Sequence, residues 1–186
     1  MKFHFLIVVA SISLTSCSTQ LADYKGTSPE FSLTEYFNGQ VTAWGIVEDY
    51  SKKLTRRFCV DIIGSWEPTE NGMSGTLDET FYYADGETQT RIWRLNISPS
   101  GEVTGTAGDV IGTATGKAEG TAFNWEYTLT VPVSGTTWEF AVDDWMYMMD
   151  NNRLMNRSYL SKWGVTVAEI SIFFDKTQPV RTCRSE

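Results

Sequence analysis

The side chains of this sequence that could do chemistry are carboxylates and arginines. Glu79 and Arg91 lie on two strands that we expect to be neighbours, and Asp143 and Asp144 follow one another on a third. A pair of carboxylates can act as general acid and base, as in glycoside hydrolysis. Successive residues of a strand point to opposite faces, so Asp143 and Asp144 cannot serve one substrate together. Asp144 shares the apolar face of its strand, where we expect it to meet a tyrosine hydroxyl or an arginine. The candidate arginines are Arg91, Arg94 and Arg157.

Most other catalytic chemistry is excluded. The single histidine, His4, lies in the apolar N-terminal segment, so the rest of the chain cannot form a Ser-His-Asp site or a histidine zinc site. Residues 112–117 resemble a phosphate-binding loop, but the spacing is one residue short and Ala118 replaces the Mg²⁺-binding hydroxyl. We therefore expect no catalytic residue, no metal and no cofactor. An enzyme that uses Asp144 or Glu79 is the alternative.

The N-terminal segment predicts export and lipidation. Lys2 supplies positive charge, and residues 3–12 are apolar but too few to span a bilayer. Leu14-Thr15-Ser16-Cys17 resembles a bacterial lipobox, which implies cleavage before Cys17 and acylation of that residue on its sulfur and its new amino group. Three acyl chains anchor a protein stably in a membrane. The absence of an aspartate directly after Cys17 favours the outer membrane, facing the periplasm, by analogy with enteric lipoproteins. An ordinary signal peptide with a chance cysteine is the alternative.

Length and charge indicate one acidic domain. We expect residues 1–16 to be a signal peptide, residues 17–28 a lipidated N-terminus and polar tether, and residues 29–186 a single β-barrel domain. The net charge of −8 argues against nucleic acid as a partner, because phosphate binding needs a basic surface. The membrane contact is thus expected through the lipid anchor and not through the protein surface.

Cys59 and Cys183 are the cysteines that follow the lipobox. An oxidising compartment would allow them to form a disulfide that ties the C-terminal tail to the domain. Two unpaired thiols are the alternative, since the sequence does not show that these residues meet.

The elements that must position these side chains are short strands separated by turns. A helical turn is expected from Pro29 to Phe37, with Ser28 as its N-cap. Alternating or β-rich runs then follow one another, with hairpin signals such as Asp85-Gly86 between them, which favours an antiparallel up-and-down barrel or a sandwich. The expected strands are 40–49, 53–63, 73–84, 87–97, 102–107, 109–118, 121–131, 136–148, 153–160 and 165–174.

One hairpin register can be predicted. If residues 84–86 form a three-residue loop, Leu77 faces Trp93 and Glu79 faces Arg91. The Glu79–Arg91 pair would then either orient the polar head of a ligand or fix the register as a structural ion pair. The tryptophans on apolar faces would either line a cavity or fill a core. These tryptophans are Trp93, Trp125 and Trp138.

Eight short motifs stand in a distinctive order between Phe31 and Phe174. They are Leu77-Asp78-Glu79-Thr80-Phe81, Asp85-Gly86, Arg91-Ile92-Trp93, Gly108-Asp109-Val110-Ile111-Gly112, Trp125-Glu126-Tyr127, Asp143-Asp144-Trp145-Met146-Tyr147, Asn156-Arg157-Ser158 and Lys162-Trp163-Gly164. In this order they resemble the bacterial lipoprotein family catalogued as domain of unknown function 3833, which has no established activity. The helical lead-in before the first strand resembles that of lipocalin and calycin barrels, which implies the same fold.

Two functional hypotheses follow. In the first, the protein is a lipid-anchored, non-enzymatic component of the bacterial envelope that binds or carries a small apolar or amphipathic molecule in its barrel. In the second, it is a structural or assembly component whose barrel is filled and takes no ligand. The space between Trp93, Trp125 and Asp144 distinguishes the two hypotheses.

Overall fold

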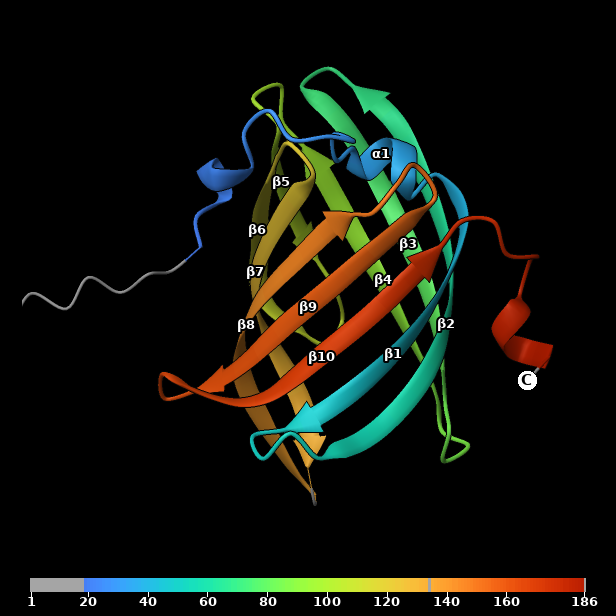
Figure 1. The fold of residues 1–186 in the computed structure, drawn as a ribbon, viewed down its shortest axis with the longest axis vertical. Helices are drawn as coiled ribbons and strands as arrows, with labels where there is room; N and C mark the ends of the chain where they lie inside the picture. Colours follow the sequence, from blue (N-terminus) through green and yellow to red (C-terminus); the bar gives the residue numbers. More distant parts are fainter. Residues whose placement is uncertain (1–18, 134, 186) are drawn as a thin grey trace, which may run out of the picture.

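The chain forms a closed antiparallel barrel (Figure 1). The computed structural model describes residues 19–133 and 135–185; the predicted signal peptide and Cys17 lie outside them. Each strand pairs with its neighbours in the sequence, and β1 pairs with β10 to close the sheet. This topology confirms the up-and-down, lipocalin-like barrel expected from the sequence and excludes the sandwich. The strands are β1 (Gly39–Asp49), β2 (Leu54–Thr69), β3 (Gly72–Tyr83), β4 (Thr88–Ile97), β5 (Glu102–Thr106), β6 (Val110–Glu119), β7 (Ala122–Val133), β8 (Thr136–Met148), β9 (Arg153–Lys162) and β10 (Val165–Asp175).

The strand positions match the predicted segments closely, with one clear difference at β2. This strand was expected to end near residue 63 but continues to Thr69. Its pairing with β1 ends at Gly64, so the later residues pair with β3 alone. Pro68 is tolerated in this stretch because its missing N–H falls where the strand has only one partner.

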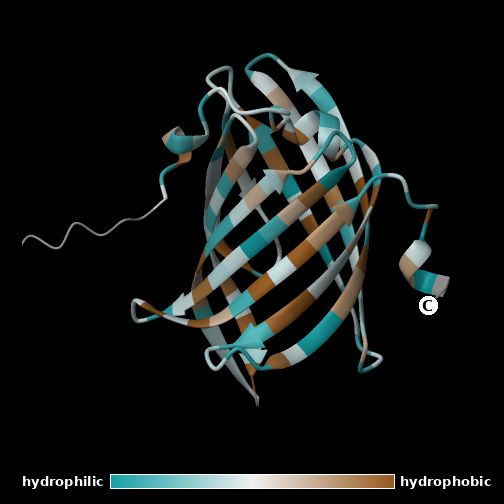
Figure 2. Cartoon of the chain, viewed as in Figure 1, coloured by the Kyte–Doolittle hydropathy of each residue, from teal (hydrophilic) through white to brown (hydrophobic). Residues whose placement is uncertain are grey.

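Hydrophobic and hydrophilic residues alternate along the strands (Figure 2). In β7, the inward side chains include Phe123, Trp125 and Leu129, all of them buried, whereas Glu126 between them is exposed. This alternation places one face of every strand inside the barrel. The predicted hairpin register is also confirmed, because Leu77 pairs with Trp93 and Glu79 pairs with Arg91.

A short helix closes the upper end of the barrel in Figure 1. This helix, α1 (Leu33–Tyr36), begins four residues later than expected, and its N-cap is Ser32, whose hydroxyl accepts a hydrogen bond from the backbone of Glu35. The prediction of a cap at Ser28 was wrong because the preceding residues are held against the barrel. The backbone N–H of Phe31 donates to the carbonyl of Gly120, and the ring of Phe31 stacks on Phe123 at 5.0 Å.

Part of the segment expected to be a tether also lies on the barrel. Residues Leu21–Tyr24 form the 3-10 helix η1, which contacts β6 and β7. The ring of Tyr24 lies 6.1 Å from that of Trp145 and 5.6 Å from that of Tyr147, on the outside of the barrel. This aromatic contact holds a segment whose composition alone is typical of a free linker.

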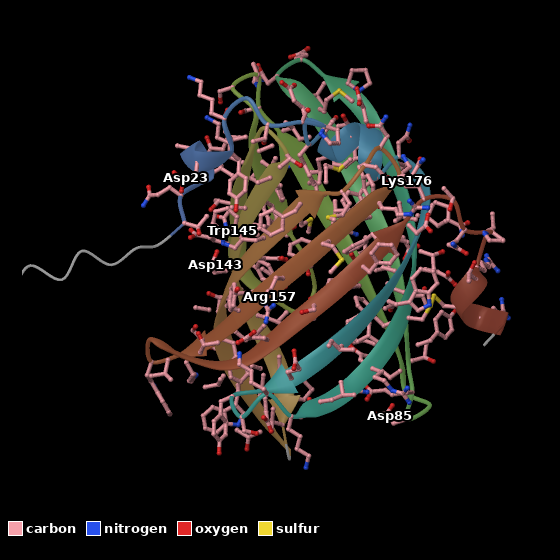
Figure 3. All side chains as sticks on the ribbon, viewed as in Figure 1. Asp23, Asp85, Asp143, Trp145, Arg157 and Lys176 are labelled. Atoms are coloured by element: carbon pink, nitrogen blue, oxygen red, sulfur yellow. A yellow bond between two sulfur atoms is a disulfide. The ribbon has the colours of Figure 1, made fainter. Side chains whose placement is uncertain are left out.

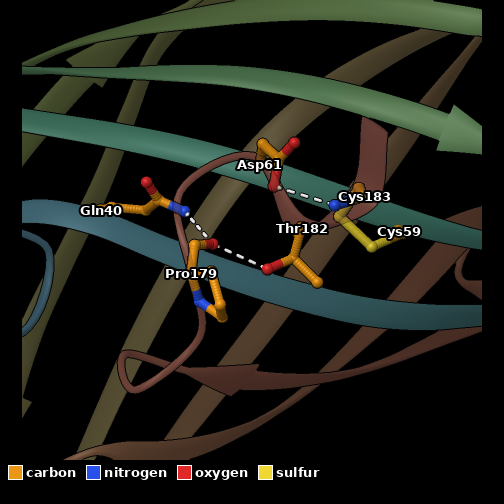
Figure 4. The surroundings of a disulfide bond; sticks show 6 residues. All are labelled: Gln40, Cys59, Asp61, Pro179, Thr182 and Cys183. Carbon is orange, nitrogen blue, oxygen red and sulfur yellow. Dashed lines mark hydrogen bonds between the residues drawn. A yellow bond between two sulfur atoms is a disulfide. The ribbon is translucent and has the colours of Figure 1, made fainter. Parts of the chain in front are cut away.

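The C-terminal tail is attached to the outside of β2. Cys59 and Cys183 form a disulfide, which settles the alternative that the sequence left open. The tail ends in the 3-10 helix η2 (Thr182–Ser185), and the backbone N–H of Cys183 donates to Asp61 (Figure 4). Gln40 donates to the carbonyl of Pro179 in the same tail. Within residues 19–133 and 135–185, no helix is both long enough and apolar enough to cross a membrane.

Candidate functional site

The barrel encloses a cavity of about 400 Å³. Leu33 and Phe37 line it at the end closed by α1. At the other end, which carries the β1–β2, β3–β4 and β7–β8 hairpins, its lining includes the exposed residues Glu87, Gln89 and Pro132. A volume of this size lies within the range of sites that hold one small organic molecule. The tryptophans of the interior therefore line a cavity and do not fill it.

The central wall of the cavity is aromatic. The ring of Trp93 meets Trp125 edge to face at 5.7 Å and Tyr127 at 5.5 Å. Two glycines of neighbouring strands make room for Trp125. A Cβ atom on Gly116 would lie 2.4 Å from the Trp125 ring, and one on Gly105 would lie 3.1 Å from it. Glycine is thus required at these two positions of β5 and β6 because the large side chain of Trp125 packs against them.

Arg91 forms the centre of a largely buried ion network. Its Nε donates to both carboxylate oxygens of Asp109 at 3.0 Å, and its Nη2 donates to Asp109 Oδ2 at 2.6 Å. Glu79 Oε2 lies 3.7 Å from Arg91 Nη1, an ion pair without a hydrogen bond. Burial lowers the pKa of Arg91, but the carboxylates of Glu79 and Asp109 raise it above its usual value. Arg91 therefore stays charged and is bound mainly by Asp109.

The Arg91–Asp109 pair also spans a seam in the barrel wall. The short strand β5 pairs only with the second half of β4, from Arg94 to Ile97. Asp109 lies in the loop after β5, and its carbonyl accepts hydrogen bonds from the N–H and the hydroxyl of Thr130 on β7. The ion pair consequently links β4 to β7 where these strands have no direct ladder. Arg91 has a structural role in addition to its position in the cavity.

Asp144 is buried on the inner face of β8, with 5% of its surface exposed. Its carboxylate accepts hydrogen bonds from Asn156, from Ser158 at 3.1 Å and from the hydroxyl of Tyr127 at 3.4 Å. Burial raises the pKa of Asp144 to about 6, although these three hydrogen bonds lower it. Asp143 projects from the outer surface, as the strand alternation predicts (Figure 3).

Glu79 is the least satisfied polar group of the cavity. Its Oε2 is buried and accepts no hydrogen bond from the residues that the structure describes. Burial raises the pKa of Glu79 to about 7; Arg91 lowers it, whereas the charges of Asp109 and Asp144 raise it further. Glu79 thus takes up or releases its proton near neutral pH.

Of the predicted site residues, the structure brings Glu79, Arg91, Trp93, Trp125 and Asp144 to one cavity. Asp144 was expected to meet an arginine or a tyrosine hydroxyl, and the structure confirms the tyrosine, Tyr127. Arg91 is held by Asp109, and Arg157 pairs with Glu169 on the outside, where Figure 3 shows it.

The expectation that Trp138 lines the interior was also wrong. Trp138 lies on the inward face of β8, but near the β7–β8 hairpin. It precedes Ala141, the first residue of β8 that pairs with β9. It is therefore 37% exposed, and its ring meets that of Trp163 at 6.3 Å.

Three further residues of the site, Asp109, Asn156 and Ser158, were not predicted from the sequence. Asp109 follows a glycine in a loop, and only the fold brings it to Arg91. Asn156 and Ser158 alternate on β9, and this spacing of two is the signal that places both on the face of Asp144. Across the described part of the chain, no group of three or more His, Cys, Asp or Glu residues could hold a metal ion.

The fold and the cavity define a lipocalin-like barrel with an aromatic interior and a polar centre. A comparison with solved structures supports this class. The S-type phycobiliprotein lyase CPES from Guillardia theta is similar in fold, with a TM-score of 0.55 and 10% sequence identity over 80% of this chain and 95% of that chain. At this identity the likeness concerns the fold alone. The sequence model of the family described as protein of unknown function DUF3833 matches residues 11–176, and this chain belongs to that family. No curated protein matches the chain.

Proposed function

We propose that this protein is a lipid-anchored component of the bacterial envelope that binds one small apolar or amphipathic molecule inside its barrel. The observation that carries the proposal is the cavity between Trp93, Trp125 and Asp144. A barrel with a purely structural role would be expected to fill this space, since protein interiors are close-packed and empty volume is destabilising. The filled-barrel alternative is therefore the weaker one.

The proposed anchor rests on the sequence Leu14-Thr15-Ser16-Cys17. The disulfide between Cys59 and Cys183 supports an exported protein, because such bonds persist in oxidising compartments. Outer-membrane location is proposed from the residues that follow Cys17. The test is the intact mass of the protein from its native membrane: it should correspond to a chain that starts at Cys17 and carries three acyl groups. A Cys17→Ala variant that stays in the membrane fraction would contradict the anchor.

We propose binding and not catalysis because Arg91 and Asp144 are both held by other residues of the cavity. Asp144 accepts three hydrogen bonds, and Arg91 is fixed by Asp109. An enzyme based on carboxylates is the second candidate. It is favoured by the raised pKa of Glu79, about 7, since catalytic acids and bases often have such values. Conversion of the bound molecule by wild-type protein, lost in Glu79→Gln, would establish this second candidate.

Binding can be tested on the protein from its native host. The purified protein is extracted with organic solvent, and the extract is compared with that of two variants by mass spectrometry. Val131→Trp places a large side chain in the cavity near its hairpin end, whereas Glu139→Trp places the same side chain on the exposed outer face of β8. We expect one molecule that is present in wild type and Glu139→Trp and depleted in Val131→Trp. Identical extracts from the two variants would refute binding in the barrel.

A further inference from the structure

The charges inside the cavity do not balance. At the hairpin end, Arg56 pairs with Glu87 at 2.8 Å. At the centre, Arg91 is held by Asp109 through three hydrogen bonds. Arg56 and Arg91 are the two arginines that line the cavity, and each is therefore already paired with a carboxylate. Two further carboxyl groups, Glu79 and Asp144, line it without a hydrogen bond from a cation among the described residues; the cation nearest to Glu79 is Arg91, shared with Asp109, at 3.7 Å.

The same two groups have free capacity to accept hydrogen bonds. Glu79 Oε2 is buried and unpartnered, and Arg91 Nη1 lies at 3.7 Å from it, beyond hydrogen-bond distance. Asp144 Oδ2 accepts one long hydrogen bond, of 3.4 Å, from Tyr127. A buried acceptor without a partner is costly, and a donor from a ligand would remove that cost. The carboxylate oxygens of Glu79 and Asp144 can therefore accept hydrogen bonds from a ligand that carries a donor.

The geometry points to a ligand whose polar end is a positively charged hydrogen-bond donor of the primary-ammonium class, bound at Glu79 in the field of Asp144. This inference rests on the proposed function and specifies its ligand. The apolar part of the molecule packs against Trp93 and Trp125, whose ring faces also favour a nearby cation. A fatty-acid carboxylate is disfavoured, because it would bring a third unbalanced negative charge into a site of low dielectric.

The titratable groups that face this position come from four strands and one loop. They are Glu79 of β3, Arg91 of β4, Asp109 of the β5–β6 loop, Tyr127 of β7 and Asp144 of β8. Burial and the charge of Asp144 raise the pKa of Tyr127, which therefore stays neutral. At pH 8 both Glu79 and Asp144 are ionised, and at pH 5 both are protonated. The preference for a cation should accordingly weaken from pH 8 to pH 5.

The test compares three molecules with the same chain and different heads: decylamine, decanol and decanoate. Each is titrated at pH 8 into the full-length lipidated protein in lipid nanodiscs, with empty nanodiscs as the blank, by isothermal titration calorimetry. We expect decylamine to bind about ten-fold or more tightly than decanoate, the effect of one charge-assisted hydrogen bond. Glu79→Gln should weaken decylamine about ten-fold and leave decanol unchanged, whereas Asp78→Asn, its exposed neighbour on β3, should change neither.

The outcomes separate this inference from the proposed function. If decanol or decanoate binds and decylamine has no advantage, the ammonium site is refuted and binding in the barrel stands. Equal decylamine affinity in wild type and Glu79→Gln refutes it in the same way. If none of the three molecules binds, the ammonium site is refuted, and the extraction experiment decides the proposed function separately. The comparison of the three heads on wild-type protein does not depend on the folding of any variant.

Discussion

The buried carboxyl of Glu79 should make the stability of the barrel depend on pH between 5 and 8. Burial raises its pKa from 4.5 to about 7. The folded state therefore binds a proton that the unfolded state has released, and stability falls as pH rises through this range. The whole difference between the folded and unfolded pKa of Glu79 corresponds to about 3 kcal/mol, at 1.36 kcal/mol per pKa unit. Of this, about 2.5 kcal/mol of the free energy of unfolding is lost between pH 5 and pH 8.

This pH range isolates the groups inside the cavity. Hydrogen bonds lower the pKa values of the turn residues Asp49, Asp85 and Asp150 below 3.8, so these groups change stability only at more acidic pH. Asp144, with a pKa of about 6, adds to the slope in the lower half of the range and with the same sign.

The assay is urea denaturation of the disulfide-bonded protein at pH 5, 6, 7 and 8 and constant ionic strength. Wild type should lose stability steadily towards pH 8. Glu79→Gln should lose about 2.5 kcal/mol less over the same range, because its amide does not titrate. Asp78→Asn, which alters an exposed carboxyl on the same strand, should keep the wild-type slope. If Glu79→Gln shows the wild-type slope, the pKa of Glu79 is not raised in the folded protein.

Three further substitutions test the disulfide, the packing around Trp125 and the Arg91–Asp109 pair. Replacing Cys59 and Cys183 together by serine should lower the free energy of unfolding by about 2–5 kcal/mol in urea, because the disulfide closes a loop with a sequence separation of 124 residues. An unchanged unfolding midpoint would mean that this bond does not restrain the unfolded chain. Gly116→Ala should lower stability by about 1–3 kcal/mol and alter tryptophan fluorescence, because the added methyl group would overlap the ring of Trp125. Gly108→Ala is the control, since its methyl group would enter open space. Equal effects of the two changes would refute this packing. Arg91→Met should cost about 1.5–3 kcal/mol, because Asp109 loses the charged donor of its hydrogen bonds. A cost below about 0.5 kcal/mol would contradict a structural role of this pair.

Strand pairing was predictable because local rules determine it. A left-handed glycine fixes the length of a hairpin loop, and a period of two fixes which side chains share a face. The register of Leu77 with Trp93 and of Glu79 with Arg91 followed from these rules alone. The position of Asp144 inside and Asp143 outside followed from them as well.

Partners between distant segments were not predictable in the same way. Asp109 reaches Arg91 because β5 is short and its following loop enters the seam between β4 and β7. Ser32, and not Ser28, caps α1 because Phe31 is held in place by Phe123, a residue of β7. Such contacts depend on how the sheet closes, which no local pattern encodes.

The interior of the barrel argues for a ligand because it is poorly arranged for stability alone. Buried carboxyl groups with raised pKa values are costly at neutral pH, and apolar residues of similar volume in place of Glu79 and Asp144 would be expected to stabilise the fold. The chain instead places both groups beside empty volume and aromatic rings, with an acceptor of Glu79 unpartnered. Natural sequences depart from local consistency mainly at functional sites. A donor that entered the cavity would satisfy the acceptor, balance the charge and fill the volume, so one molecule accounts for all three departures.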